Sequence, residues 1–427
     1  MTDYAELHSH LYGCLTLDDL RYLAGRNKPR WEIFLKSYES AYGRNADIQD
    51  LMAPESDSRL RSYYHFKGPP DFPKFQSAFD LIIALSSTEP GELFEVASRV
   101  CARETAVHAE YRQLFSPMIS VSEFEEKTGA LAEAMTAACK NHPGKTFRLV
   151  MSLPRNPVTG PVLFESVRKL KRAGKNIVGI DFCAQEEGYP PSLLSDLLST
   201  IKSAEERYSI LYHVGESFRD KSVESAVRWV VEAALAGAHR LGHAAALGMD
   251  PDVFRGSTRE ELASERLDQI DFEIKNYDSI REFILARPAP GSAAAMVPNK
   301  DQLSQEARDI RASGKKVVSV FYSPERTEFL RAFQDWAMSQ VAATGAVVEC
   351  CPASNQAIIG ITRNHPLLRF LKSNVRCVIG ADDPGIFDTD LEKEFETVRK
   401  WGVSESEIAQ LKNNSMEFTS EKLTAVD

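Results

Sequence analysis

The chain has 427 residues, of which 43% are hydrophobic and 26% charged, and its formal net charge is −10. This composition is typical of a soluble globular protein, and its acidity argues against nonspecific binding to nucleic acid, whose phosphates it would repel. No run of about 18 apolar residues and no signal-peptide pattern is present, and the seven cysteines follow no regular spacing. We therefore expect a cytoplasmic protein with free thiols and no membrane partner.

Eight short β-rich runs recur along the chain, separated by segments with helical patterns. They predict strands at residues 5–10, 108–115, 147–153, 177–182, 209–213, 238–243, 346–351 and 375–381. Several are continuously apolar, which is typical of strands buried on both faces of a parallel sheet. Eight such units predict an α/β fold, a (β/α)8 TIM-type barrel, in one domain spanning residues 1–427.

Helix signals lie between these runs. The segment from Thr16 to Asp19 has the pattern of a capped helix start. Phe72, Phe75 and Phe79 recur at helical spacing on one face. A further amphipathic segment, residues 222–235, ends near Gly237, a good stop signal.

One interval is too long for a single crossover. About 100 residues separate the sixth and seventh predicted strands, where a crossover unit needs only about 30. We interpret residues 251–340 as an inserted, mostly helical subdomain, with a flexible Ala/Pro/Gly-rich loop at 286–292 and an extra strand at 317–322. Its basic residues fit a solvated face better than a phosphate or partner site; they are Lys300, Arg308, Arg311, Lys315 and Lys316.

A pair of histidines ends the first predicted strand. His8 and His10 are two residues apart, so both side chains point to the same side of a strand. The pair also lies at the carboxyl end of its strand, where barrel active sites are found. Taken alone, the pattern fits two surface or hydrogen-bonded histidines better than a metal site.

Other candidate ligands end other predicted strands. His213 and His243 follow the fifth and sixth strands, and the eighth strand ends in Asp382-Asp383-Pro384. Three imidazoles and one carboxylate would complete a zinc site with room for a water. Each has a simpler explanation, because His213 fits a core histidine and the aspartates fit a turn.

Several motifs together resemble the adenosine deaminase family. They occur in the family's order and on the expected strands, and weaker similarity extends over nearly the whole chain except residues 251–340. The motifs are Glu6 to Gly13, His213-Val214-Gly215-Glu216, Leu241-Gly242-His243, Cys351 to Asn355 and Asp382-Asp383-Pro384.

The resemblance implies a role for each matching residue. His8, His10, His213 and Asp382 would hold one Zn²⁺ per chain. Glu216 would donate a proton to a ring nitrogen, His243 would orient the attacking water and shuttle its proton, and Asp383 would bind the attacking oxygen and a purine nitrogen. The implied reaction is hydrolytic deamination of a small-molecule 6-aminopurine, which releases ammonia.

Three positions depart from the family pattern, and all three belong to the implied substrate site. Tyr12 stands where adenosine deaminases carry an aspartate for the ribose, and Ala184 stands at a glycine whose backbone N–H meets the purine. Gln76 interrupts the helix face on which Phe72, Phe75 and Phe79 would cover the substrate. After these changes the candidate substrates are adenosine, an adenine nucleotide derivative, adenine and an N6-substituted adenine.

Two other functions remain possible at this point. A two-metal amidohydrolase would usually carry a bridging lysine on the fourth strand, and residues 177–182 contain none. A nucleoside-binding protein with weak or no catalysis would have kept the fold while losing chemical residues, yet all seven are present. The sequence does not decide the oligomeric state.

Overall fold

A computed structural model describes residues 3–286, 297–361 and 364–425. Eight parallel strands form one sheet in the order β1-β2-β3-β4-β5-β6-β9-β10. The sheet closes where the backbone N–H of His10 donates to Asp382 O (2.9 Å) and that of Asp382 to His8 O (2.7 Å). The strands are β1 (Ala5–His10), β2 (His108–Leu114), β3 (Thr146–Ser152), β4 (Ile177–Phe182), β5 (Ser209–Val214), β6 (Arg240–His243), β9 (Val347–Cys350) and β10 (Arg376–Ile379).

The predicted (β/α)8 barrel is confirmed, and each of the eight predicted strands overlaps one of these eight. The strands are almost entirely buried because helices surround the sheet. Around the barrel lie α6 (Val121–Asn141), α7 (Thr159–Arg172), α8 (Ser195–Lys202), α9 (Val223–Leu235), α15 (Pro324–Thr344), α19 (Leu391–Lys400), α20 (Glu405–Glu417) and α21 (Ser420–Ala425).

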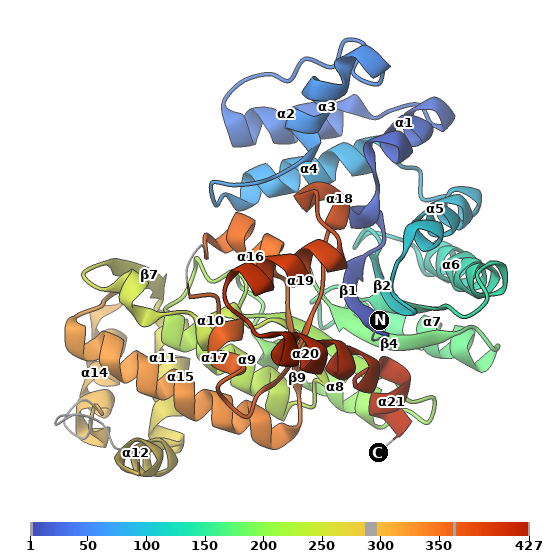
Figure 1. The fold of residues 1–427 in the computed structure, drawn as a ribbon. Helices are drawn as coiled ribbons and strands as arrows, with labels where there is room; N and C mark the ends of the chain where they lie inside the picture. Colours follow the sequence, from blue (N-terminus) through green and yellow to red (C-terminus); the bar gives the residue numbers. More distant parts are fainter. Residues whose placement is uncertain (1–2, 287–296, 362–363, 426–427) are drawn as a thin grey trace.

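A long helical segment connects β1 to β2 and stands above one end of the barrel (Figure 1). Thr16 begins it with a capping box, in which its side chain and that of Asp19 each accept the other's backbone N–H. Its helices are α1 (Leu17–Arg26), α2 (Trp31–Tyr42), α3 (Asp57–Tyr64), α4 (Phe72–Leu85) and α5 (Pro90–Arg103). This helical segment places α4, with its phenylalanines, over the carboxyl ends of the strands.

A second addition lies between β6 and β9. The antiparallel hairpin of β7 (Thr258–Leu262) and β8 (Val317–Phe321) encloses α11 (Ala263–Lys275), α12 (Tyr277–Leu285) and α14 (Lys300–Ser313). The chain then enters α15, which packs against α9. The extra strand expected at 317–322 is present as β8, whereas the loop expected at 286–292 lies outside the described residues from position 287 onward.

Short helices shape the loops at the strand ends. They are α10 (Ala245–Gly248), α16 (Pro352–Ile359), α17 (Leu367–Phe370) and α18 (Pro384–Phe387), with 3-10 turns η1 (Tyr12–Cys14), η2 (Pro54–Ser56), η3 (Pro191–Leu194) and η4 (Pro251–Phe254). All seven cysteines carry free thiols. Over the described ranges, every helix is too short or too polar to cross a bilayer.

Candidate active site

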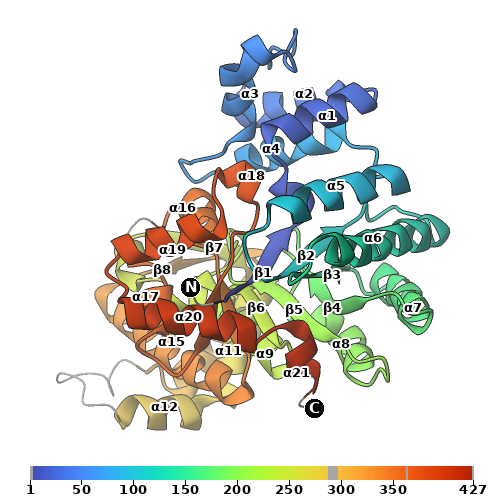
Figure 2. The same cartoon turned by 45° about the vertical axis from the view of Figure 1, so that its right-hand side comes forward.

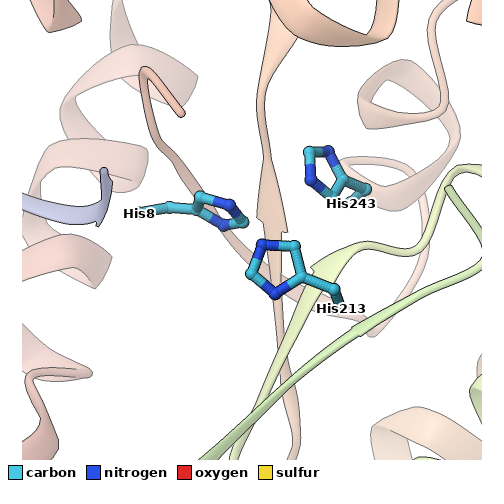
Figure 3. Close-up of side chains that lie close together, drawn as sticks. All are labelled: His8, His213 and His243. Atoms are coloured by element: carbon cyan, nitrogen blue, oxygen red, sulfur yellow. The ribbon is translucent and has the colours of Figure 1, made fainter. Parts of the chain in front are cut away.

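Five side chains from four strands converge at the carboxyl end of the barrel. His8 and His10 come from β1, His213 from β5 and His243 from β6, while Asp382 follows β10. Figure 3 shows the rings of His8, His213 and His243 turned toward one another. The ligand atoms of His8, His10 and Asp382 all lie within 4.8 Å of one another, as do those of His8, His213 and His243.

The separations between these atoms fit a tetrahedral metal ion. His10 Nε2 lies 3.3 Å from His213 Nε2 and 3.4 Å from Asp382 Oδ1, and His8 Nε2 lies 3.6 Å from Asp382 Oδ1. Ligands about 2.0–2.1 Å from a tetrahedral zinc would be roughly 3.3 Å apart. The residues present therefore suit zinc in both chemistry and spacing.

Buried carboxylates fix the orientation of two of the imidazoles. His8 Nδ1 donates to Glu349 Oε2 at 2.8 Å, and His213 Nδ1 donates to Asp181 Oδ1 at 3.0 Å. Each bond leaves Nε2 with its lone pair directed into the site, as metal-binding histidines require. Asp181 and Glu349 are thus positioning residues that the sequence reasoning missed, although each is a lone carboxylate in an otherwise apolar strand.

A network of buried charges lies directly beneath the site. Arg112 contacts His8 and donates to Glu349 at 2.5 Å, and Arg240 pairs with Glu349 at 3.0 Å and with Glu110 at 2.5 Å. All four charged side chains are fully buried. Because each cation faces a carboxylate, the network holds charge in the barrel interior without an unpaired ion.

The electrostatics keep the imidazoles of His10, His213 and His243 neutral. The pKa of His8 is raised instead: burial and Arg112 oppose its protonation, but Glu349 and the hydrogen bond to Asp382 outweigh them. Burial lowers the pKa of His10 to about 3 and also lowers the pKa of His213 and of His243. Burial opposes ionisation of Asp382, but its hydrogen bond from His8 and the neighbouring imidazoles hold its pKa well below the usual range. Neutral rings beside an ionised carboxylate are the protonation states that bind a divalent metal.

The pKa values of the other two acids in the site, Glu216 and Asp383, are shifted upward. Burial, reinforced by the charge of Asp382, raises the pKa of Glu216 and of Asp383 well above the usual carboxyl range. Glu216 Oε2 lies 3.5 Å from His243 Nε2. Asp383 Oδ1 is buried without a hydrogen-bond partner among the described residues. A protonated Glu216 can donate a proton, and Asp383 can bind a polar group that enters the site.

The backbone conformation at the strand ends directs His243, Asp382 and Asp383 into the site. His243 and Asp382 have φ of 63° and 62°, in the left-handed region that costs an ordinary residue about 1–2 kcal/mol. Such strain is common where a strand end turns a side chain into a site. Gly13 leaves space for Asp383, since a Cβ on Gly13 would lie 1.8 Å from Asp383 Oδ1.

The loop that carries Glu216 is held from below by another carboxylate. The buried Glu186 accepts the backbone N–H groups of Gly215 at 2.9 Å, and of Glu216 and Ser217 at 3.1 Å each. His243 is held in a similar way, because Asn355 Nδ2 lies 3.1 Å from His243 Nδ1 and Asn355 Oδ1 lies 3.1 Å from His365 Nε2. His365 therefore supports His243 through Asn355.

The proposed substrate-side residues come from three segments: helix α4, the loop after β4 and the turn η1. Phe75 of α4 is buried and stacks on Phe387 of α18, with ring centroids 5.5 Å apart, and Phe72 and Phe79 are partly buried beside it. Ala184 is exposed after β4 with φ of 66°. The Tyr12 hydroxyl donates its proton to the buried Glu92 of α5 at 2.8 Å.

Comparison with known proteins shows the family and supports the fold. The family profile described as adenosine deaminase matches residues 39–280 and 330–422. An adenosine deaminase of Streptococcus agalactiae is 25% identical over 286 residues, covering 65% of this chain and 74% of that protein. An adenine deaminase of Arthrobacter aurescens has a similar fold, with a TM-score of 0.58, 17% identity and coverage of 100% and 98% of the two chains.

Two further solved structures share the fold. An amidohydrolase of Burkholderia ambifaria with bound zinc has a TM-score of 0.60 and 15% identity, covering 99% of this chain and 88% of that one. An Arabidopsis N6-methyl-AMP deaminase has a TM-score of 0.57 and 16% identity, covering 100% and 97%. The barrel, the cluster at its carboxyl end and the family match define a hydrolytic deaminase with a candidate metal site. The chain belongs to the adenosine deaminase family.

Proposed function

We propose that this protein is a zinc-dependent aminohydrolase that replaces the amino group of a 6-aminopurine compound by oxygen and releases ammonia. The observation that carries the proposal is the arrangement of His8, His10, His213 and Asp382 around one point. Three of the separations between their ligand atoms are 3.3–3.6 Å, close to those of tetrahedral ligands, and Glu216 lies alongside. The similarity to deaminases of adenine, adenosine and N6-methyl-AMP supports a purine substrate.

The bound metal supplies the Lewis acid that makes hydroxide available at neutral pH. The remaining steps belong to the chain's own residues. His243 orients the attacking water and takes its proton, held in place by Asn355. Glu216, kept protonated by burial, gives a proton to the ring nitrogen beside the carbon under attack. Asp383, whose Oδ1 has no hydrogen-bond partner among the described residues, binds the entering oxygen and a purine nitrogen.

The substrate side is proposed in outline. Phe72, Phe75 and Phe79 of α4 cover the purine, and the backbone N–H of Ala184 meets its far edge. Tyr12 forms the wall beyond His10, but its proton is held by Glu92, so its oxygen faces the substrate only as an acceptor. A plain ribose hydroxyl would therefore meet a weaker partner than the aspartate of typical adenosine deaminases. Adenine and N6-substituted adenine compounds are accordingly alternative substrates.

The test is ammonia release from a panel of adenine, adenosine, deoxyadenosine, AMP and N6-methyl-AMP, together with the metal content of the purified protein. We expect one zinc per chain and turnover of at least one compound. Glu216→Gln should lower kcat by at least 100-fold while ligand binding changes little, because it keeps the shape but lacks the acidic proton. Two metal ions per chain, or no turnover of the panel by the zinc-loaded protein, would contradict the proposal.

A further inference from the structure

A pocket of about 560 Å³ adjoins Glu216 at the mouth of the barrel. Its walls come from the start of α4, the loop after β5, the loop after β6 with η4, strand β7 and the end of α16. Strand β7 lies next to α16 in both ribbon views (Figures 1 and 2). The pocket shares Glu216 with the catalytic cluster, and its lining includes no residue of β1. It therefore extends from the Glu216 side of the site.

Two arginines give this pocket its charge. Arg219 follows Glu216 by three residues, is exposed and lies over the Phe72 ring, 5.5 Å from its centroid. Arg259, on β7, lies over the rings of Phe218 at 5.2 Å and Phe254 at 5.6 Å. Within the described parts of the chain, neither guanidinium forms an ion pair with a carboxylate.

The contacts of Arg259 leave part of its guanidinium available. Its Nε donates to Lys221 O at 3.2 Å, and its Nη2 donates to Phe218 O. These bonds fasten the hairpin to the loop that carries Glu216, while Nη1 makes no hydrogen bond to the described residues. The one carboxylate in the lining besides Glu216 is Asp71, which caps α4 and pairs with Lys74 at 3.1 Å. The lining thus holds two guanidinium groups and two carboxylates, and one of the carboxylates, Asp71, is already paired with a lysine outside the pocket.

The rest of the lining is largely apolar. Met249, Phe254, Ile358 and Ile359 contribute apolar side chains to it. A group held here would therefore combine an apolar part with a negative charge. Two guanidinium groups, of which that of Arg259 is anchored by hydrogen bonds, suit a carboxylate or a phosphate better than a neutral hydroxyl.

We propose that this pocket is a subsite for an anionic group carried by the substrate, and that Arg219 and Arg259 determine specificity for it. This inference rests on the proposed function and adds a substrate class to it. Arg259 comes from the addition between β6 and β9, which thereby contributes to the substrate site. The basic residues noted in the sequence on and after α14 are exposed, and none of them lines the pocket.

The hydrolysis is the same whether the substrate carries its anionic group on the amino nitrogen or on the ribose. Water supplies the oxygen that bonds to the purine carbon C6, the C6–N bond breaks, and the nitrogen leaves with two protons and its substituent as ammonia or an amine. No oxidant or reductant is required. The location beside Glu216 favours an acid on the amino nitrogen over a 5′-phosphate.

The experiment compares matched substrates that differ by one anionic group. The pairs are adenosine with AMP, and N6-propyladenosine with N6-(2-carboxyethyl)adenosine. The proteins are the zinc-loaded wild type, Arg219→Gln, the double variant Arg219→Gln/Arg259→Gln, and Arg255→Gln as a control, since Arg255 pairs with Asp252 and does not line the pocket. We expect the wild type to prefer the anionic member of at least one pair by tenfold or more in kcat/KM. The double variant should reduce that preference at least tenfold, and the control should not.

Equal kcat/KM within both pairs for the wild type, or equal losses for anionic and neutral members in the variants, would overturn the subsite. Calorimetric binding of the same pairs to Glu216→Gln separates the two proposals, because it needs no turnover. Selective binding of an anionic member without any turnover by the wild type would refute the proposed reaction and retain the subsite. Turnover without selective binding would do the reverse.

Discussion

Ala184 directly after β4 provides the sharpest test of the strained backbone at the site. Its φ of 66° lies in the left-handed region, and its side chain is exposed. An L-residue there costs about 1–2 kcal/mol relative to glycine. Glycine in turn loses more conformational freedom on folding, which costs about 0.5–1 kcal/mol. Because an exposed methyl contributes little burial, Ala184→Gly should leave the free energy of unfolding unchanged or raise it by up to about 1.5 kcal/mol.

The matched control is Ala173→Gly. Ala173 is also exposed, but its φ is −78° at the end of α7. Glycine relieves no strain there, so this variant should lose about 0.5–1 kcal/mol. Urea unfolding followed by circular dichroism would measure both variants at equal protein and zinc concentrations. An equal loss of stability in Ala184→Gly and Ala173→Gly would refute the argument that position 184 is strained.

Three further predictions concern the support of the site. Glu349→Gln should weaken zinc binding by about 10–100-fold in a chelator competition, because the amide is a poorer acceptor for His8 Nδ1; unchanged affinity would exclude Glu349 as a positioning residue. Phe75→Ala should lower the free energy of unfolding by about 3–5 kcal/mol, since Phe75 is buried and stacked on Phe387, and Phe94→Ala, at a half-exposed site on α5, should cost far less; similar losses would contradict the stacking role. Burial raises the pKa of Glu394 to about 7, so the folded protein binds a proton that the unfolded chain releases between about pH 4.5 and 7. The free energy of unfolding should therefore fall as pH rises through that window, and Glu394→Gln should remove one proton's share of the fall; an identical pH profile in the variant would refute the shift.

The sequence alone predicted the barrel and the side chains that the structure brings together at the carboxyl ends of its strands. Apolar runs such as residues 177–182 are local signals, because a strand buried on both faces must be apolar along its length. The strand-end positions of His8, His213, His243 and Asp382 could be read for the same reason, since parallel strands present their carboxyl ends on one face.

Only the tertiary structure showed which residues orient the histidines of the site and which line the pocket beside it. Glu349, 341 positions away along the chain, meets His8 only because the barrel closes, whereas Arg112, 104 positions away, meets it because β2 pairs with β1. The left-handed backbone of His243 and Asp382 likewise arises from the turns that the closed barrel imposes. Arg259 was not distinguished from the other basic residues of its segment until the pairing of β7 with β8 placed it at the pocket beside Glu216. Local patterns record burial and secondary structure, whereas contacts between distant segments depend on how the whole chain packs.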